Sequence, residues 1–343
     1  MTAAVFAVAV WWPQIRCDAP NKFRQPEELS EDGLRHYMSD GCQIDANGYR
    51  NRAVPDRSDI VALGDSNTWG VSVYADETWP RILERETKLS VYNISMPAWG
   101  PDDILMAMPR ALQLKPKFVI VGLYLGNDIY EAYERIARPP RGYEAVAAPF
   151  HVPDEIVDDW IWEAAEIEAK VLGTVAWRPW GWTTPEKDSN RIQIVSVNGS
   201  AAAVTPRFRL LGVNLAEPRI AYGLTVAKAL LATMNQLARQ HEARLVVVIQ
   251  PSKEYVYCGL VAHESMSPEW KAACHFEQRI IHDIGHVLRA ESIPYASALE
   301  ELRTQARRGQ TIYPITDAHP NRAGTECIAH AARRAIMAAS RGP

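Results

Sequence analysis

The 343-residue sequence contains only five cysteines, and none of them belongs to a Cys-x-x-Cys pair. The Cys/His spacing typical of zinc sites is also missing, so the sequence indicates neither a metal nor another cofactor. An odd number of cysteines leaves at least one thiol unpaired. The two that lie closest in sequence, Cys258 and Cys274, fit either a disulfide in an oxidising compartment or two buried reduced thiols.

The chain has no excess of basic residues. Its 37 Lys and Arg residues face 41 Asp and Glu residues, which gives a net charge of −4. Binding to a phosphate backbone requires a basic surface, so nucleic acid is not an expected partner. The composition shows no sign of disorder, coiled coil or repeats, and 47% hydrophobic residues suffice for one large core with a substantial insertion.

The N-terminal segment, residues 1–16, is apolar but short. Its run from Thr2 to Trp12 is below the roughly 20 residues that span a bilayer, and it lacks the basic start of a signal peptide. It fits the end of a membrane anchor, an unusual export signal, or a helix packed on the domain. We expect an exported, periplasmic or membrane-anchored protein, attached to the membrane through this segment; a cytoplasmic location is the alternative. Residues 17–343 are expected to form one domain.

Apolar segments rich in β-branched residues alternate along the chain with segments of helical periodicity. This alternation predicts an α/β protein with three α/β/α layers and a flavodoxin-like parallel sheet. Strands are expected at residues 59–63, 91–94, 118–124, 245–249 and 294–296, and helices at 78–88, 102–112, around 224–234, 268–290 and 322–339.

The alternation stops at about Ile129 and resumes at about Arg219. The residues between them contain several prolines, a tryptophan cluster and a strand-like piece at 192–197. We therefore expect 129–219 to be an insertion that forms a cap beside the functional edge of the sheet. Residues 17–58 are polar and are expected to form an irregular lead-in.

Polar side chains follow the expected strands at the points where the strands end. Ser66 follows the first, Asn93 to Gly100 the second and Asn127 the third, while Asp317 and His319 precede the last helix. Function in open parallel sheets gathers at the carboxyl ends of the strands. One Ser, one His and one Asp at such loops are the inventory of a nucleophile, its base and an orienting acid. The other histidines lack this placement and are expected to be surface or core residues.

Four short blocks resemble those of the SGNH (GDSL) hydrolase family, in the family's order. They are Gly64-Asp65-Ser66, Asn93 with Gly100, Gly126-Asn127-Asp128, and Asp317-Ala318-His319-Pro320-Asn321. The flanking Asn47-Gly48-Tyr49-Arg50-Asn51 and Pro251-Ser252-Lys253-Glu254 fit as well. The resemblance covers about residues 45–128 and 244–340, and leaves the insertion outside.

The resemblance implies a metal-independent serine esterase. Ser66 would attack the acyl carbon, His319 would carry the proton, and Asp317 would hold the imidazolium. The oxyanion would meet the backbone N–H of Ser66, a backbone N–H of the second block, and the Asn127 amide. Two departures stand out. Ala98 occupies the position where the family usually has its oxyanion glycine, so either Ala98 or Gly100 would donate, and one residue instead of two separates Asp317 from His319.

Several further residues have two interpretations. Asp65 is expected to tie its loop to the backbone. Lys253 and Glu254 at the end of the fourth strand fit either substrate contact or a salt bridge to a neighbouring loop. Trp180 and Trp182 belong to a cluster of tryptophans that fits core or lid packing, or else an aromatic platform for a sugar ring or acyl chain.

These features predict a hydrolase of O-acyl esters whose substrate is a small-molecule or carbohydrate ester. The first alternative is an O-acyltransferase of cell-surface polysaccharide, which would form the same acyl-enzyme and differ only in its acceptor. The block order favours the hydrolase, because alginate-type acetyltransferases place Asp-x-His ahead of the serine block. The second alternative is a non-catalytic carbohydrate-binding or assembly subunit with the same fold.

Overall fold

A computed structural model describes residues 27–29, 34–37, 39, 43–157, 176–178, 181–183 and 191–340. For residues 27–29, 176–178 and 181–183 it describes only the backbone. The predictions made for residues 1–16 and for Trp180 therefore fall outside the described residues. Trp182 lies in a described strand, but its side chain does not belong to the described part.

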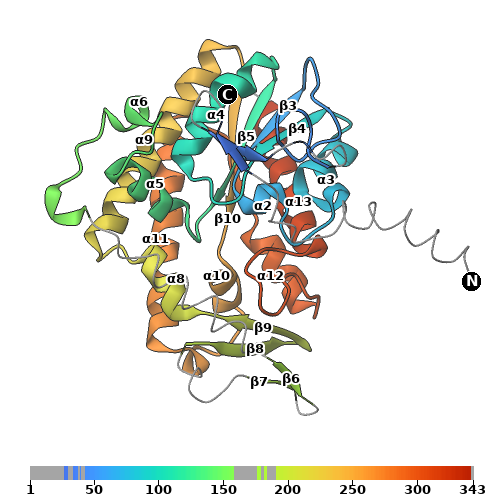
Figure 1. The fold of residues 1–343 in the computed structure, drawn as a ribbon. Coiled ribbons are helices and arrows are strands. Elements are labelled where there is room, and N and C mark those ends of the chain that lie inside the picture. The colour runs from blue at the N-terminus through green and yellow to red at the C-terminus, as the bar shows by residue number, and fades with distance from the viewer. Residues whose placement is uncertain are drawn as a thin grey trace, which may run out of the picture.

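Five parallel strands form the central sheet (Figure 1). They are β3 (Ile60–Gly64), β4 (Val91–Ser95), β5 (Phe118–Tyr124), β10 (Arg244–Gln250) and β11 (Tyr295–Ser297). Their spatial order is β4-β3-β5-β10-β11. Numbered along the chain, this order is 2-1-3-4-5, which is the flavodoxin-like order. Successive strands are added first on one side of β3 and then on the other, so the strand order reverses between β3 and β5. The predicted sheet is thereby confirmed.

Helices cover both faces of this sheet (Figure 1). One layer consists of α4 (Pro101–Gln113), α5 (Asp128–Ala137), α9 (Pro218–Gln240) and α11 (Pro268–Ala290); the other consists of α3 (Trp79–Thr87), α12 (Leu299–Arg307) and α13 (Arg322–Ser340). Successive strand residues point to opposite faces, so Val61 and Leu63 join the first core, whereas Ile60 and Ala62 join the second. The strand sequences are apolar throughout because both faces are buried.

The expected strands and helices are all present, and most of their ends agree within a few residues. The largest difference concerns the helix predicted around 224–234, which extends over Pro218–Gln240. The added turns include Ile220, which is fully buried, and a start at Glu217, whose side chain caps the helix by accepting the N–H of Arg219.

The first helix of the range predicted to be an insertion belongs to the α/β/α layers. Helix α5 lies inside it and packs against α9 in the helical layer, so the alternation ends after Ala137 and not at Ile129. The smaller elements of the range are α6 (Glu144–Ala147), a 3₁₀ turn η2 (Asp154–Ile156), α8 (Pro206–Val213), and two hairpins, β6 (Ala176–Arg178) with β7 (Gly181–Thr183) and β8 (Gln193–Val197) with β9 (Ser200–Val204). Figure 1 shows both hairpins at one end of the molecule, near α8, α10 and α12.

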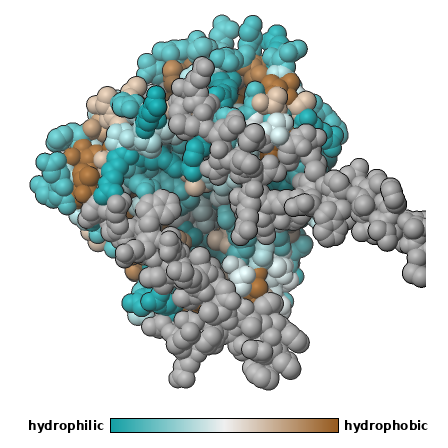
Figure 2. Space-filling model, in the orientation of Figure 1, coloured by the Kyte–Doolittle hydropathy of each residue, from teal (hydrophilic) through white to brown (hydrophobic). Residues whose placement is uncertain are grey.

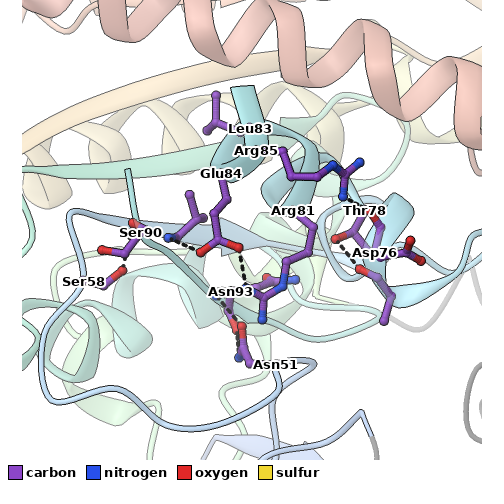
Figure 3. Close-up of polar contacts among 12 residues, drawn as sticks. Asn51, Ser58, Asp76, Thr78, Arg81, Leu83, Glu84, Arg85, Ser90 and Asn93 are labelled. Carbon is purple, nitrogen blue, oxygen red and sulfur yellow. Dashed lines mark hydrogen bonds and ion pairs between the residues drawn. The ribbon is translucent and has the colours of Figure 1, made fainter. Parts of the chain in front are cut away.

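The lead-in holds more structure than its polar composition predicts. Strands β1 (Glu27–Leu29) and β2 (Arg35–Tyr37) pair antiparallel. Farther on, Asn51 exchanges two hydrogen bonds of 2.9 Å with the backbone of Asn93 in the edge strand β4 (Figure 3). A side chain that pairs with backbone groups of an edge strand closes it against pairing with another chain. This segment therefore belongs to the folded domain.

Helix α10 (Lys253–Cys258) is tied to α11 by a disulfide between Cys258 and Cys274, whose Cα atoms are 6.4 Å apart. Of the two interpretations of this pair, the structure shows the bridge, and Cys327 is a buried free thiol. The bridged residues are 16 apart in sequence. A loop of that length implies a stabilisation of about 3 kcal/mol, mainly through the unfolded state.

We therefore expect the Cys258→Ser/Cys274→Ser double variant to lose about 3 kcal/mol of unfolding free energy. Denaturant titration of the oxidised wild type and the variant measures the difference. Cys327→Ser is the matched control, because it replaces a thiol outside the bridge. Equal midpoints for wild type and double variant would contradict the bridge.

The surface on the face drawn in Figure 2 is largely hydrophilic where residues are described, and its hydrophobic residues form separate small patches. Within the same residues, no helix combines the length and apolarity needed to cross a bilayer.

Candidate active site

Ser66 lies directly after the first strand of the sheet, at the start of the short helix α2 (Ser66–Trp69). Asp65 is the N-cap of this helix and accepts the N–H of Asn67 at 2.9 Å, the structural role expected for it. The turn is tight at Gly64, where an added Cβ would stand 2.1 Å from the Thr68 hydroxyl oxygen. The local sequence thus forces a sharp strand-to-helix turn that presents Ser66 at the carboxyl edge of the sheet.

Three predicted residues form one hydrogen-bonded chain. The Ser66 hydroxyl and Nε2 of His319 are 2.9 Å apart, although the two residues are separated by 253 positions in sequence. On the other side of the ring, Nδ1 of His319 is 2.6 Å from Oδ1 of Asp317. With the ring proton on Nδ1, that nitrogen donates to Asp317 and Nε2 accepts the hydroxyl proton of Ser66. Ser66 is buried, whereas the side chains of His319 and Asp317 are 29% and 28% exposed.

Asp317 is held by more than the imidazole. Its Oδ1 also accepts the backbone N–H of His319 at 2.9 Å, and its Oδ2 accepts the hydroxyl of Ser72 at 2.6 Å. Burial alone would raise the pKa of Asp317, but the hydrogen bonds and the neighbouring His319 outweigh it and lower the pKa to about 2. The single residue between Asp317 and His319 is therefore enough for a two-point contact, and the carboxyl group is ionised at neutral pH.

The backbone N–H groups of Ala98 and Gly100, the two candidates in the second block, differ in their hydrogen bonding. Gly100 is the N-cap of α4, and its N–H donates to the Asp103 carboxylate at 2.8 Å. The N–H of Ala98 has no acceptor within the described part of the chain. Glycine is nevertheless needed at position 100, because a Cβ there would stand 2.9 Å from Cβ of Glu131. Of the two predicted alternatives, only Ala98 has an N–H available to a ligand.

Ala98 adopts the left-handed conformation that favours glycine, with φ of +60°. Arg135 of α5 holds this turn, because its guanidinium group donates to the Ala98 carbonyl and pairs with Asp103. The side chain of Arg135 is 13% exposed. The contacts around the turn thus maintain a backbone conformation that costs an L-residue about 1–2 kcal/mol.

Because of that strain, Ala98→Gly is expected to raise the unfolding free energy by roughly 0.5–1 kcal/mol. At most positions the same exchange destabilises a protein, because glycine loses more freedom on folding. Ala107→Gly, at a buried position within α4, is the matched control and should destabilise. Chemical denaturation of the two variants gives the signs; a loss of stability in both would contradict the strained conformation.

Asn127 comes at the end of β5 and begins α5. Its side-chain amide donates to the Glu131 carboxyl group at 2.7 Å, which leaves its second N–H for another acceptor. Glu131 is buried, and this burial, together with nearby acidic groups, outweighs the attraction of Arg135 and raises the pKa of Glu131 to about 8. At neutral pH the carboxyl group beside Asn127 is therefore mainly uncharged.

The open question about Lys253 and Glu254 resolves in favour of contacts inside the protein. Both are buried, with 1% and 2% exposure. Glu254 pairs at 3.0 Å with Arg209 of α8 and accepts the N–H of Thr205 at 3.0 Å. Arg209 in turn donates to the carbonyl of Gly126, next to Asn127. The α8 segment of the insertion is thereby bonded to the loop that carries Asn127.

Four residues near the site were missed in the sequence: Ser72, Glu131, Arg135 and Arg209. Glu131 follows Asn127 by four positions, and Arg135 follows Glu131 by four. This spacing places the three residues on one helical face and is a sequence signal that could have identified them. Ser72 lies in an irregular loop and Arg209 in the insertion, where no periodicity or motif marks them. Among the described side chains, no group of three or more His, Cys, Asp or Glu residues could hold a metal ion.

No known family profile matches this chain, and no curated protein matches it in sequence. Solved structures with a similar arrangement of the chain include a GDSL-like lipase from Bacteroides thetaiotaomicron, with 13% identity, a TM-score of 0.39, and coverage of 82% of this chain and 88% of that chain. A psychrotrophic esterase from Pseudoalteromonas has 10% identity, a TM-score of 0.41, and coverage of 82% and 98%. A variant of an acetyl-xylooligosaccharide esterase from Geobacillus has 8% identity, a TM-score of 0.40, and coverage of 81% and 94%.

Proposed function

We propose that this protein is a serine ester hydrolase of the SGNH type, which cleaves an O-acyl ester through an acyl-enzyme. The observation that carries the proposal is the hydrogen-bonded chain from Ser66 through His319 to Asp317. A hydroxyl bonded to an imidazole that is itself oriented by an ionised carboxylate is the arrangement that activates serine as a nucleophile.

In the first half of the reaction, the Ser66 oxygen attacks the acyl carbon while Nε2 of His319 takes the hydroxyl proton. The carboxylate of Asp317 stabilises the imidazolium that forms, and it stays ionised because its pKa is about 2. The tetrahedral intermediate then expels the alcohol, which receives the proton from His319. The product is an ester between Ser66 and the acyl group.

The negative oxygen of the intermediate requires hydrogen-bond donors that are already in position. The backbone N–H groups of Ser66 and Ala98 have no acceptor in the described chain, and the Asn127 amide has one N–H left after its bond to Glu131. We assign these three groups to the oxyanion. An uncharged Glu131 supports the assignment, because a carboxylate there would repel the developing charge.

The second half of the reaction repeats these roles with water. His319 removes a proton from a water molecule, the resulting hydroxide attacks the acyl carbon, and the Ser66 oxygen leaves with the proton returned by His319. No cofactor or metal ion takes part in the proposed steps. The same acyl-enzyme would serve a transferase, in which a sugar hydroxyl replaces water.

A carbohydrate ester outside the cytoplasm is the substrate class that we propose. The disulfide between Cys258 and Cys274 supports an oxidising compartment, where such bridges persist. The tryptophans of the insertion, including Trp180 and Trp182, offer flat rings of the kind that stack on sugars. Membrane attachment through residues 1–16 belongs to the same proposal.

The test is an ester panel that contains p-nitrophenyl acetate, p-nitrophenyl palmitate and acetylated xylo-oligosaccharide. We expect hydrolysis of the acetyl esters, with release of free acetate and saturation at lower concentration of the sugar ester. Product analysis with added unacetylated sugar separates the alternatives, because acetyl transfer to that sugar would identify a transferase. An absence of turnover on every ester would contradict the hydrolase.

A further inference from the structure

We propose that Lys253 is a positioning residue, whose buried ammonium group fixes the loop that carries Asp317 and His319. The proposal rests on the function proposed above and extends it to a residue that does not touch the reacting atoms. Lys253 begins α10 at the end of strand β10, beside the edge of the sheet where Ser66 lies.

All three hydrogen bonds of the ammonium group end on one loop. Nζ of Lys253 donates to the carbonyl oxygens of Pro314 at 3.0 Å, Ile315 at 2.7 Å and Asp317 at 3.2 Å. These bonds use every donor that a lysine has. The last of the three acceptors belongs to the residue that orients His319.

The loop between α12 and α13 is also held by the Ser72 hydroxyl on Asp317 and by two buried side chains, Ile312 and Tyr313. It has no helix or strand of its own, and within it the N–H groups of Asp317 and Asn321 donate to the carbonyls of Pro314 and Ile312. The N–H of Ala203 in β9 donates to the Ile315 carbonyl at 3.0 Å, so that this oxygen accepts from both sides. Lys253 binds three carbonyl oxygens of the loop at once and thereby links the loop to the end of strand β10.

Burying the charged ammonium group of Lys253 carries a desolvation penalty, which indicates that the charge has a role at this position. Removing an ammonium group from water is unfavourable, and a hydrocarbon side chain of the same volume would avoid that desolvation penalty. The neighbouring Glu254 does not bond to Lys253, because its carboxylate is paired with Arg209. The loop carbonyls thus provide the direct partners of the charge.

The other charged groups near Lys253 are engaged elsewhere. Glu277 of α11 accepts the N–H of Ser252 at 2.7 Å, and Asp317 is bonded to His319 and Ser72. The ring of Tyr313 lies with its centroid 5.9 Å from Nζ. Burial lowers the pKa of Lys253, and the attraction of Glu254 and Asp317 only partly opposes this, so the pKa is about 8.

Two results follow for the variant Lys253→Met, which keeps the volume of the side chain and removes its donors. The loop loses its anchor, so kcat and the rate of Ser66 labelling by a fluorophosphonate should fall about 100-fold, while KM changes less than threefold. In addition, wild-type kcat/KM should decline as pH rises through about 8, when Lys253 loses its proton and one donor. Because ionisation of Glu131 near the same pH would also lower kcat/KM, the comparison is made in a Glu131→Gln background, where the decline should be absent from the Lys253→Met/Glu131→Gln double variant.

Two controls separate the role of Lys253 from other causes. Leu288→Ala removes a fully buried side chain of α11 that lies at the opposite edge of the sheet. It should lower the midpoint of chemical denaturation and leave the rate of Ser66 labelling unchanged. Glu131→Gln removes the other group whose pKa is about 8, and the alkaline decline should persist in it.

Each outcome decides one of the two proposals. If wild-type Ser66 is not labelled, the proposed function fails. If wild type is labelled and Lys253→Met is labelled equally fast, the positioning role fails while the function stands. Should Lys253→Met not fold, the pH profile of Glu131→Gln decides: a flat profile between pH 7 and 9 contradicts the role of Lys253.

Discussion

Ser66→Ala and His319→Ala are each expected to lower kcat by roughly 10⁴- to 10⁶-fold, and the double variant is expected to lose no more than either single variant. The reason is that the hydroxyl and the imidazole act as one unit, joined by the 2.9 Å hydrogen bond. Without either partner the nucleophile cannot be activated, so the second substitution removes nothing further. Steady-state hydrolysis of p-nitrophenyl acetate measures all three variants.

The matched controls carry the same substitutions far from the site. Ser267→Ala removes the N-cap of α11, and His330→Ala removes a histidine of α13 that contacts Glu86. Ser267→Ala should lose about 1 kcal/mol of stability, and both control variants should retain their turnover. Losses that add in the double variant, or a Ser66→Ala enzyme as active as these controls, would contradict the proposed roles.

Asn127→Ala is expected to lower kcat by about 10²- to 10³-fold with little change in KM. Its amide is assigned to the oxyanion, which exists only after attack on the ester, so its loss affects the transition state more than substrate binding. The unfolding free energy should change by less than 2 kcal/mol, because within the described part of the chain the Asn127 side chain makes one hydrogen bond, to Glu131. Separate determination of kcat and KM checks this prediction.

Asn235→Ala is the control for that substitution. Its amide donates to the carbonyl of Glu291 near the opposite edge of the sheet, so it tests the loss of a comparable hydrogen bond away from Ser66. Its kcat should equal that of wild type. An Asn127→Ala enzyme with unchanged kcat, or one in which KM rises as much as kcat falls, would remove Asn127 from the oxyanion.

The sheet could be predicted because its signal is local. Segments such as Val119 to Tyr124 are apolar and β-branched, and the helices between them show their own period, so the alternation alone implies a parallel sheet with two covered faces. The structure of the lead-in and of the insertion was harder to predict, because it depends on individual hydrogen bonds such as the two between Asn51 and Asn93. No residue pattern announces such a bond.

The site likewise contains residues that could be predicted from the sequence and features that required the coordinates. Ser66, Asn127, Asp317 and His319 follow from the ends of predicted elements together with the resemblance in four blocks. The choice between Ala98 and Gly100 required the coordinates, because it depends on the N–H of Gly100 being bonded to Asp103. The positive φ of Ala98, which favours glycine, likewise cannot be recognised from the sequence.

Most supporting contacts could not be predicted, and for Lys253 and Glu254 the sequence indicated a neighbouring loop only as one of two interpretations, without identifying that loop. Ser72 reaches Asp317 across 245 positions, and Lys253 reaches the same loop across more than 60. Such contacts depend on how loops from different strands meet above the sheet, which local sequence does not specify.

The most direct test is to treat the wild-type protein with a fluorophosphonate and to locate the adduct by peptide mass spectrometry. The Ser66 oxygen should displace fluoride and retain the phosphonyl group, and prior exchange of His319 for alanine should abolish the reaction. Stoichiometric modification of Ser66 alone is the predicted result. A wild-type protein that stays unmodified, or one modified at another serine while Ser66 remains free, would contradict the account.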